Sequence, residues 1–237
     1  CRSREAEARG LSLSLYGRLV AQGVEPFFLD TQFRAHPKLM DFSAKYIYNG
    51  RLRSGIDGRA RRAVRGFAWP RLSVPLAFIE TGGLKNKAGE SVEAESKSNP
   101  AEAALLLRVL ARVLAAGDVG AENIGVVTPY KGQVKLLRQM WRQQCAKQKA
   151  PAEYSKLEIA SVDNFQGREK DLVLFSAVRA NTRGSVGFLA DWRRLNVMLT
   201  RARRGLVVIG NAATLRYDAL WQQWLASVEA HGCLVDR

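Results

Sequence analysis

The sequence of 237 residues lacks the residue combinations on which several classes of enzyme and of extracellular protein depend. Its three cysteines, Cys1, Cys145 and Cys233, are far apart, and it has only two histidines. No C-x-x-C pair occurs, so neither a structural zinc site nor a disulfide framework is expected. A sparse, odd set of cysteines is typical of reducing, intracellular conditions.

Long apolar runs are also missing, and no stretch approaches the length of a membrane span. No signal-peptide pattern opens the chain. We therefore expect a cytoplasmic protein without a membrane partner. The chain begins with cysteine rather than methionine, which predicts a fragment or a processed product.

The usual motifs of a complete nucleotide-hydrolysing site are absent. Such a domain normally supplies G-x-x-x-x-G-K-[ST], whose backbone cradles phosphates. This chain contains no Gly-Lys dipeptide, and it has no Asp-Glu dipeptide at a strand end to hold Mg²⁺. Neither G-x-S-x-G nor H-E-x-x-H occurs. The sequence excludes a whole ATPase site, but it leaves room for one half of a shared site.

What the chain does have is positive charge. Lys and Arg total 37 against 22 for Asp and Glu, which gives a net charge of +15. Arginines cluster at 58–66, 191–196 and 200–205. Such an excess favours a polyanionic partner, most often nucleic acid. A basic surface that serves only solubility is the alternative.

Short apolar, β-branched runs alternate with helical patterns along most of the chain, which predicts an α/β fold. The sheet should be mainly parallel and RecA-like, with helices on both faces. The clearest helix spans 98–117, where Asn99 caps, Pro100 occupies the first turn and Gly117 ends the helix. The other expected elements are strands at 26–30, 75–80, 123–130, 157–163, 171–178 and 205–211, helices at 37–48, 131–146, 191–201 and 214–230, and a surface loop at 82–98.

Polar clusters follow four of these expected strands, at 30–37, 128–133, 161–169 and 178–181. Open parallel sheets bind ligands at the carboxyl ends of their strands. The clusters therefore predict a phosphate-handling cleft at that edge. Any one of them alone is equally well explained as a solvated turn.

Four stretches resemble, in order and spacing, helicase motifs IV to VI of superfamily 1. They read "TQFRAHP" (31–37), "VVTPYKGQ" (126–133), "SVDNFQGREKD" (161–171) and "RRLNVMLTRARRGLVVIGN" (193–211). Within that superfamily the chain is similar to the up-frameshift RNA helicases of nonsense-mediated mRNA decay. The resemblance implies that residues 1–237 form a second RecA-like motor domain. A first RecA-like domain, with the P-loop and the metal ligands, would lie upstream.

The resemblance also implies an activity for the complete protein, namely ATP-dependent 5′–3′ RNA unwinding, with ATP and Mg²⁺ as cofactors. The implied partners are single-stranded RNA, the first domain of the same protein and decay-factor proteins. Two alternatives stay open. One is a non-catalytic, basic nucleic-acid-binding module, and the other is the same domain of a related DNA or RNA helicase.

Five residues are implied at the ATP site. Arg34 and Arg201 would be catalytic and reach the γ-phosphate, because a guanidinium is a planar fork that matches phosphate oxygens. Phe33 would stack on adenine, although the family usually has tyrosine there. Gly167 would let the backbone approach the nucleotide, and Glu169 would bind the ribose.

A second implied group faces the RNA strand, where small hydroxyl and amide groups suit backbone phosphates. Phe33 and Tyr130 are alternatively packing residues, and His36 is interpreted as structural. We expect Arg201 and Arg204 to share one face of the 191–201 helix and its extension, with Arg204 a solvated charge. The RNA-facing residues are Thr128, Pro129, Tyr130, Ser161, Val162 and Asn181.

Overall fold

The computed structural model describes residues 3–82, 89–93 and 96–235, and the chain divides into two compact units, Cys1–Asp30 and Thr31–Arg237. The first unit contains two short helices, α1 (Arg4–Ala8) and α2 (Leu15–Ala21), and neither buries a residue. Each begins at a serine whose side chain accepts a hydrogen bond from the helix.

The strand expected at 26–30 does not form, and residues 24–30 have no regular secondary structure. Phe27 and Leu29 are exposed. A strand is stabilised by pairing with a neighbour, and none of the described strands pairs with this segment. The apolar run was therefore a misleading signal.

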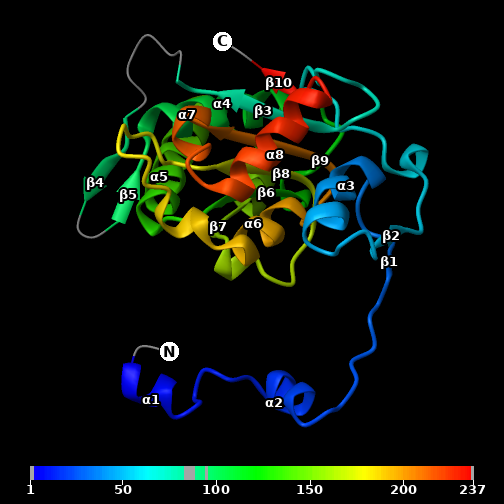
Figure 1. The fold of residues 1–237 in the computed structure, drawn as a ribbon. Coiled ribbons are helices and arrows are strands. Elements are labelled where there is room, and N and C mark those ends of the chain that lie inside the picture. Colours follow the sequence, from blue (N-terminus) through cyan, green and yellow to red (C-terminus); the bar gives the residue numbers. More distant parts are fainter. Residues whose placement is uncertain (1–2, 83–88, 94–95, 236–237) are drawn as a thin grey trace. The chain divides into compact units, whose positions relative to one another are not determined.

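The second unit is built on a six-stranded sheet with the order β10-β3-β9-β8-β6-β7 (Figure 1). All neighbouring strands in it are parallel. This confirms the predicted α/β fold with a parallel sheet, as in RecA-like domains. The strands are β3 (Leu76–Glu80), β6 (Ile124–Thr128), β7 (Glu158–Ser161), β8 (Lys170–Ser176), β9 (Ala202–Gly210) and β10 (Leu234–Val235).

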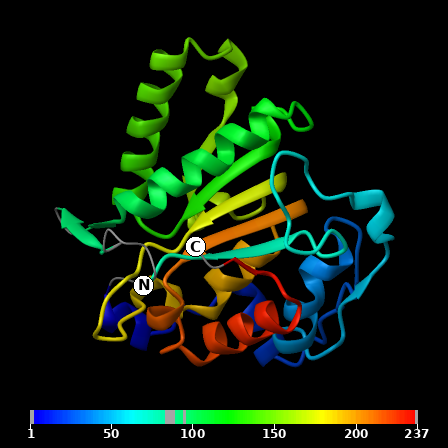
Figure 2. The same cartoon turned by 90° about the horizontal axis from the view of Figure 1, so that it is seen from above.

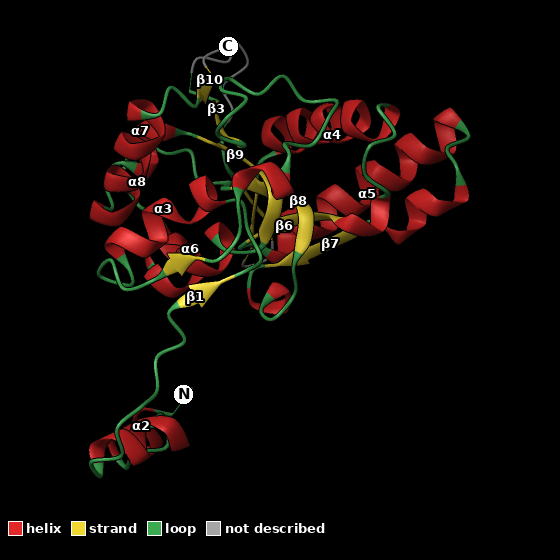
Figure 3. Ribbon diagram, turned by 90° about the vertical axis from the view of Figure 1, so that its right-hand side faces the viewer, coloured by secondary structure: helices red, strands yellow, loops and turns green. Residues whose placement is uncertain are grey.

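Helices cover both faces of this sheet, as its continuously apolar strands require (Figures 2 and 3). On one face lie α4 (Pro100–Ala115) and α5 (Lys131–Gln148). On the other lie α3 (Pro37–Tyr46), α6 (Trp192–Leu199), α7 (Ala212–Leu215) and α8 (Ala219–Ala230).

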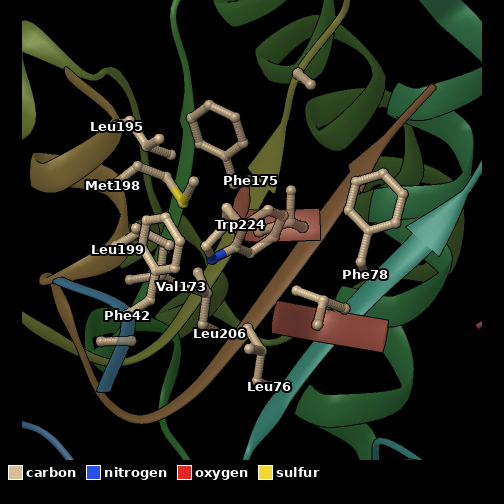
Figure 4. Packing of buried hydrophobic residues seen from close by; sticks show 14 of the residues in the cluster. Phe42, Leu76, Phe78, Val173, Phe175, Leu195, Met198, Leu199, Leu206 and Trp224 are labelled. Atoms are coloured by element: carbon tan, nitrogen blue, oxygen red, sulfur yellow. The ribbon is translucent and has the colours of Figure 1, made fainter. Parts of the chain in front are cut away.

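The core beneath the second group of helices contains a group of aromatic rings among aliphatic side chains (Figure 4). Phe78 of β3 and Trp224 of α8 meet edge to face, with ring centroids 5.9 Å apart. Phe175 of β8 lies within 6.4 Å of the ring of Trp221. These contacts fix α8 against the centre of the sheet.

Local signals explain where the helices begin. The Asn99 side chain accepts a hydrogen bond from Glu102 N at 3.1 Å, so α4 starts where predicted. His36 does the same for α3, because its Nδ1 accepts from Lys38 N at 3.2 Å. The structural interpretation of His36 is therefore confirmed, and burial lowers the pKa of its ring.

Two small two-stranded sheets also occur in the described part of the chain. The pair β1 (Thr31–Gln32) and β2 (Arg53–Ser54) is parallel, and the pair β4 (Ser91–Glu93) and β5 (Ser96–Ser98) is antiparallel. The segment expected as a loop at 82–98 thus contains a hairpin, while residues 83–88 and 94–95 lie outside the described part. No described helix is both long enough and apolar enough to cross a bilayer.

Candidate functional site

The residues predicted to act at ligands separate into two groups, one at each end of the parallel strands. Thr128, Ser161 and Asn181 stand at or just after the carboxyl ends of β6, β7 and β8. In contrast, Glu169 directly precedes β8, and Arg201 directly precedes β9. The single cleft that we predicted at the carboxyl edge is therefore wrong for the charged half of the motif.

The reason lies in the connection from β7 to β8, residues 162–169. Both strands flank β6 and are parallel to it, so this short segment must run from the carboxyl end of β7 to the amino end of β8. Phe165 anchors it as a fully buried side chain. Its ring fills the space in which a Cβ at Gly125 of β6 would stand. The charged residues after Phe165, namely Arg168 and Glu169, therefore lie at the amino edge of the sheet.

At the amino edge, Glu169 binds two arginines at once. One carboxylate oxygen accepts from Nε of Arg34, and the other accepts from Arg203, whose Nε lies 3.1 Å away. The hydrogen bonds from Arg34 and then Arg203 hold the pKa of Glu169 below its usual value. Asp171 also lies 3.9 Å from Arg203 Nη1, and Arg201 stands beside the cluster. Three guanidinium groups against two carboxylates leave a net positive charge, which suits an anionic ligand.

Arg34 is held in place by its own loop. The Gln32 side-chain oxygen accepts hydrogen bonds from the backbone N–H groups of Arg34 and Ala35, both at 2.8 Å. Arg34 Nη1 donates to the carbonyl of Thr200 at 3.1 Å, at the end of α6. Segments some 166 positions apart are thus joined at one point.

Arg201 lies beside this cluster, but it is not in a helix. The helix expected at 191–201 ends at Leu199, and Thr200 is its C-cap. Arg201 Nε donates to Val197 O at 3.1 Å, and its Nη2 donates to Thr200 Oγ1 at 2.7 Å. Burial, followed by repulsion from Arg34, lowers the pKa of its guanidinium.

Our expectation for Arg204 was wrong in both parts. Arg203 and Arg204 belong to β9, where successive side chains point to opposite faces, so Arg204 shares no helix face with Arg201. Nor is Arg204 a solvated charge, because its Nη2 pairs with Asp118 at 2.7 Å and its Nε donates to Arg62 O at 2.9 Å. It ties β9 to the turn after α4.

Phe33 and Gly167 are both accessible. The side chain of Phe33 is 65% exposed, which excludes the core interpretation. Its ring covers Gly55, and Arg61 donates to the carbonyls of Phe33 and Arg34 at 3.2 and 2.8 Å. Gly167 has φ +81° with open space around it, a conformation that favours glycine.

The carboxyl edge is more closed than predicted. Thr128 and Val162 are buried, and Tyr130 is buried with its hydroxyl 3.3 Å from Val186 O. The packing interpretation of Tyr130 therefore describes this structure. The Thr128 hydroxyl has no hydrogen-bond partner. Pro129, Ser161 and Asn181 are partly exposed and offer the accessible atoms.

Several residues at this edge were missed from the sequence. Arg179 is buried, pairs with Glu90 at 2.7 Å and donates to the Tyr130 hydroxyl at 3.4 Å. Although burial opposes it, hydrogen bonds from Arg179 and Lys97 lower the pKa of Glu90 to about 2. Phe188, 56% exposed, lines a cavity of about 350 Å³ beside Tyr130. The "VRAN" stretch was a usable signal for Arg179, but Glu90 lies in a stretch with no pattern.

Behind this edge lies a buried polar network that joins α4, α5 and β8. Glu102 is fully buried, and its Oε2 accepts from Ser176 Oγ at 2.6 Å and from Val178 N at 2.8 Å. Asn99 and Gln133 complete the network. Val178 has φ +71°, which a β-branched residue rarely adopts. The network holds the backbone in this conformation just before Arg179.

No group of His, Cys, Asp and Glu within the described ranges is arranged to bind a metal ion. The amino edge instead presents fixed guanidinium groups, an accessible aromatic ring and an exposed glycine. The carboxyl edge presents hydroxyl, amide and aromatic groups.

Comparison with known proteins shows which family this chain belongs to. The family described as AAA domain matches residues 11–213. The chain is 41% identical over 233 residues to the regulator of nonsense transcripts 1 homolog of Drosophila melanogaster, covering 98% of this chain and 19% of that protein. It is 39% identical over 236 residues to the ATP-dependent helicase NAM7 of Saccharomyces cerevisiae, covering 98% and 24%.

A third relative is the ATP-dependent helicase upf1 of Schizosaccharomyces pombe, 37% identical over 235 residues, covering 99% of this chain and 25% of that protein. The chain thus spans only a quarter or less of the curated relatives cited here. The family match, over residues 11–213, includes the segments that carry Arg34, Glu169 and Arg201. The chain belongs to the AAA domain family, as the C-terminal region of superfamily 1 helicases of the up-frameshift type.

Proposed function

We propose that this chain is the second RecA-like motor domain of an ATP-dependent 5′–3′ RNA helicase that acts in nonsense-mediated mRNA decay. The observation that carries the proposal is the convergence of Arg34, Arg201, Arg203 and Glu169 at the amino edge of the sheet. A module that only binds nucleic acid has no need for a second cationic site at the end of the strands opposite its nucleic-acid contacts.

In this proposal the amino edge completes an ATP site whose other half belongs to a first RecA-like domain. Arg34 and Arg201 stabilise charge on the γ-phosphate, because their planar forks match phosphate oxygens. Phe33 stacks on adenine, and the backbone at Gly167 approaches the nucleotide. Glu169 takes a ribose hydroxyl, and it also orients Arg34 and Arg203 before a ligand arrives.

The residues present fit the phosphates of ATP, since guanidinium groups sit where the net charge is positive. They do not fit Mg²⁺, for which hard oxygen ligands are needed. The metal ligands are therefore proposed for the first domain. ATP bound with its metal supplies the phosphoryl group, and this chain supplies the positioned positive charge.

The carboxyl edge is proposed to hold single-stranded RNA through Pro129, Ser161 and Asn181, with Thr128, Tyr130 and Val162 shaping the backbone beneath it. The other proposed partners are decay-factor proteins, and the proposed compartment is the cytoplasm. The proposed decay-factor partners rest on the name of a relative, "regulator of nonsense transcripts", and the proposed compartment rests on the sparse cysteines of the sequence.

The test is ATP hydrolysis by the complete protein with and without single-stranded RNA, together with displacement of a strand from a duplex. A helicase shows RNA-stimulated hydrolysis and displacement. RNA binding without hydrolysis would favour the non-catalytic module. Stimulation by DNA in place of RNA would favour a related DNA helicase.

A further inference from the structure

Helix α5 carries a row of exposed cations on one face. Lys131, Lys135, Arg138 and Arg142 follow one another at intervals of four, three and four residues, so they line up along the helix. The face that packs on the sheet is a different one, formed by the buried residues Gln133, Leu137 and Trp141. The row is thus free to meet a ligand.

These cations line a groove of about 700 Å³ at the open edge of the sheet. Ser161 and Asn164, which follow β7, also line it. Because β7 is the last of the described strands in the sheet, none of the others covers this side, and α5 lies beside it (Figure 3). Arg138 donates to Ile159 O at 3.1 and 2.7 Å and so occupies a carbonyl of that edge.

Most of this charge has no internal counterion. In the described part of the chain no carboxylate pairs with Lys131, Lys135 or Arg142. The two acids closest in sequence to Ser161 already have partners: Asp163 pairs with Arg194 at 3.0 Å, and Glu158 pairs with Arg168 and with Lys170 at 3.2 Å. Like charges one turn apart destabilise a helix, and a bound polyanion would remove that cost.

We propose that this groove binds the sugar-phosphate backbone of single-stranded RNA and extends the path that begins at the carboxyl edge. Ser161 belongs to both surfaces, so the two are continuous. From Lys131 to Arg142 the row covers about 16 Å at the helical rise, enough for several phosphates. The proposal rests on the proposed function, since it assumes that RNA occupies the carboxyl edge.

RNA is favoured over an acidic protein because the described groove offers no exposed large apolar or aromatic side chain as an anchor. Regularly spaced cations, with amide and hydroxyl groups between them, match a repeating phosphate chain. Since no ring is available for stacking on bases, the binding is independent of sequence.

The test uses the complete protein with Lys135→Gln and Arg142→Gln together. Glutamine keeps helix propensity and removes the charge. The matched control is Arg108→Gln with Arg112→Gln, two exposed arginines of α4 that lie outside the groove. Affinity for polyuridine of about 6 and about 20 nucleotides is measured at several salt concentrations, because single-strand sites span roughly 4–16 nucleotides.

For the long RNA, we expect the plot of log affinity against log salt to become shallower by about 1.4 in the groove variant, since each lost contact removes about 0.7. The short RNA and the α4 variant should keep the wild-type slope, and ATP hydrolysis without RNA should be unchanged. An unchanged slope with long RNA, or an equal change in the α4 variant, overturns the groove assignment alone. If the wild-type protein binds neither length, the proposed function fails with it.

Discussion

Glu169 sets where two guanidinium groups point before any ligand is bound. Each of its carboxylate oxygens accepts from one arginine, Arg34 on one side and Arg203 on the other. A phosphate oxygen that drew Arg34 away would leave Glu169 still paired with Arg203. The Glu169 carboxylate would therefore keep one charged partner, and moving Arg34 from Glu169 to the phosphate would cost little free energy. We therefore propose that Arg203 acts as a positioning residue for Glu169, although the sequence analysis assigned Arg203 no role.

Arg201 offers the sharpest test at this scale. In the complete protein, Arg201→Lys keeps the charge but loses the planar fork that now reaches Val197 O and Thr200 Oγ1. We expect ATP turnover to fall on the order of 10² or more, because arginines acting on a transferring phosphoryl group contribute roughly 10³–10⁵. Binding of ATP and of RNA should stay near normal.

The control for Arg201 cannot be Arg204, since Arg204 is bonded to Asp118 and supports the fold. Arg112→Lys on the exposed side of α4 changes the same group outside the site. ATPase kinetics are measured on all three proteins with RNA affinity in parallel. Near-normal turnover of Arg201→Lys, or an equal loss in Arg112→Lys, would remove Arg201 from the ATP site.

Phe33 allows stacking to be separated from fold. Its ring is exposed over Gly55, so truncation leaves no cavity in the core. In the complete protein, Phe33→Ala should weaken ATP binding by roughly tenfold, since stacking of a base on an aromatic side chain is worth about 1–3 kcal/mol. Phe33→Tyr keeps the ring and should be nearly neutral. Equal ATP affinity of the three proteins, measured by calorimetry, would contradict the stacking role.

At the scale of elements, the β7–β8 connection decides which end of the sheet each motif reaches. A crossover between parallel strands usually contains an α-helix, but here eight residues with one short 3-10 helix, Asp163–Phe165, make the connection, and Phe165 packs against Gly125. The same segment therefore offers Ser161 to one edge and Glu169 to the other. One continuous motif can in this way serve both ligands.

The helices were predictable where a cap and a hydrophobic face coincide. Asn99 and Pro100 predict the start of α4, and the apolar run at 171–178 predicts a strand that differs from β8, Lys170–Ser176, by one residue at its start and two at its end. Two elements were not predictable, because they depend on neighbours. Residues 26–30 are not paired with any of the described strands, and α6 stops at Leu199 because the next residues join β9 beside β8. The arrangement of the site was not predictable either, because the Arg34–Glu169 contact joins residues 135 positions apart in the sequence.

The network that joins α4, α5 and β8 predicts a pH dependence of stability. Burial, reinforced by the charge of Glu80, raises the pKa of Glu102 to about 8, above its ordinary value of 4.5, although the hydrogen bond from Ser176 opposes this. The folded chain thus holds the proton more tightly than the unfolded chain. The stabilisation is complete below about pH 4.5 and is lost as the pH rises through about 8.

Glu102→Gln removes the titrating group and nearly keeps its shape. Urea unfolding of the 237-residue chain between pH 5 and 9 should show wild-type stability falling relative to the variant, by at most about 1.4 kcal/mol per pH unit. If the free energies of unfolding of the two proteins differ by the same amount at every pH, the substitution has changed only the hydrogen bonds of the network. Parallel pH profiles would mean that Glu102 does not hold its proton in the folded chain.

At the scale of the whole molecule, the two edges of the sheet explain how a motor domain could connect ATP to RNA. The proposed ATP contacts sit at the amino ends of β8 and β9, and the proposed RNA contacts follow β6, β7 and β8. The central strand β8 has one set at each end. A shift of this unit as a rigid body, caused by closure onto a first domain, would move both sets together.

The same arrangement predicts that the chain alone does not turn over ATP. Its cations can stabilise charge, but the sequence lacks the P-loop that holds phosphates and the strand-end carboxylates that hold the metal. Positioning and metal together supply most of the rate in phosphoryl transfer, so half of the site should give no measurable catalysis. The measurement is steady-state phosphate release by the purified 237-residue chain, compared with the complete protein. Arg201→Lys in the isolated chain provides the control, because any contaminating ATPase would be insensitive to it. Turnover that approaches that of the complete protein and disappears with Arg201→Lys would show that this chain carries a whole site.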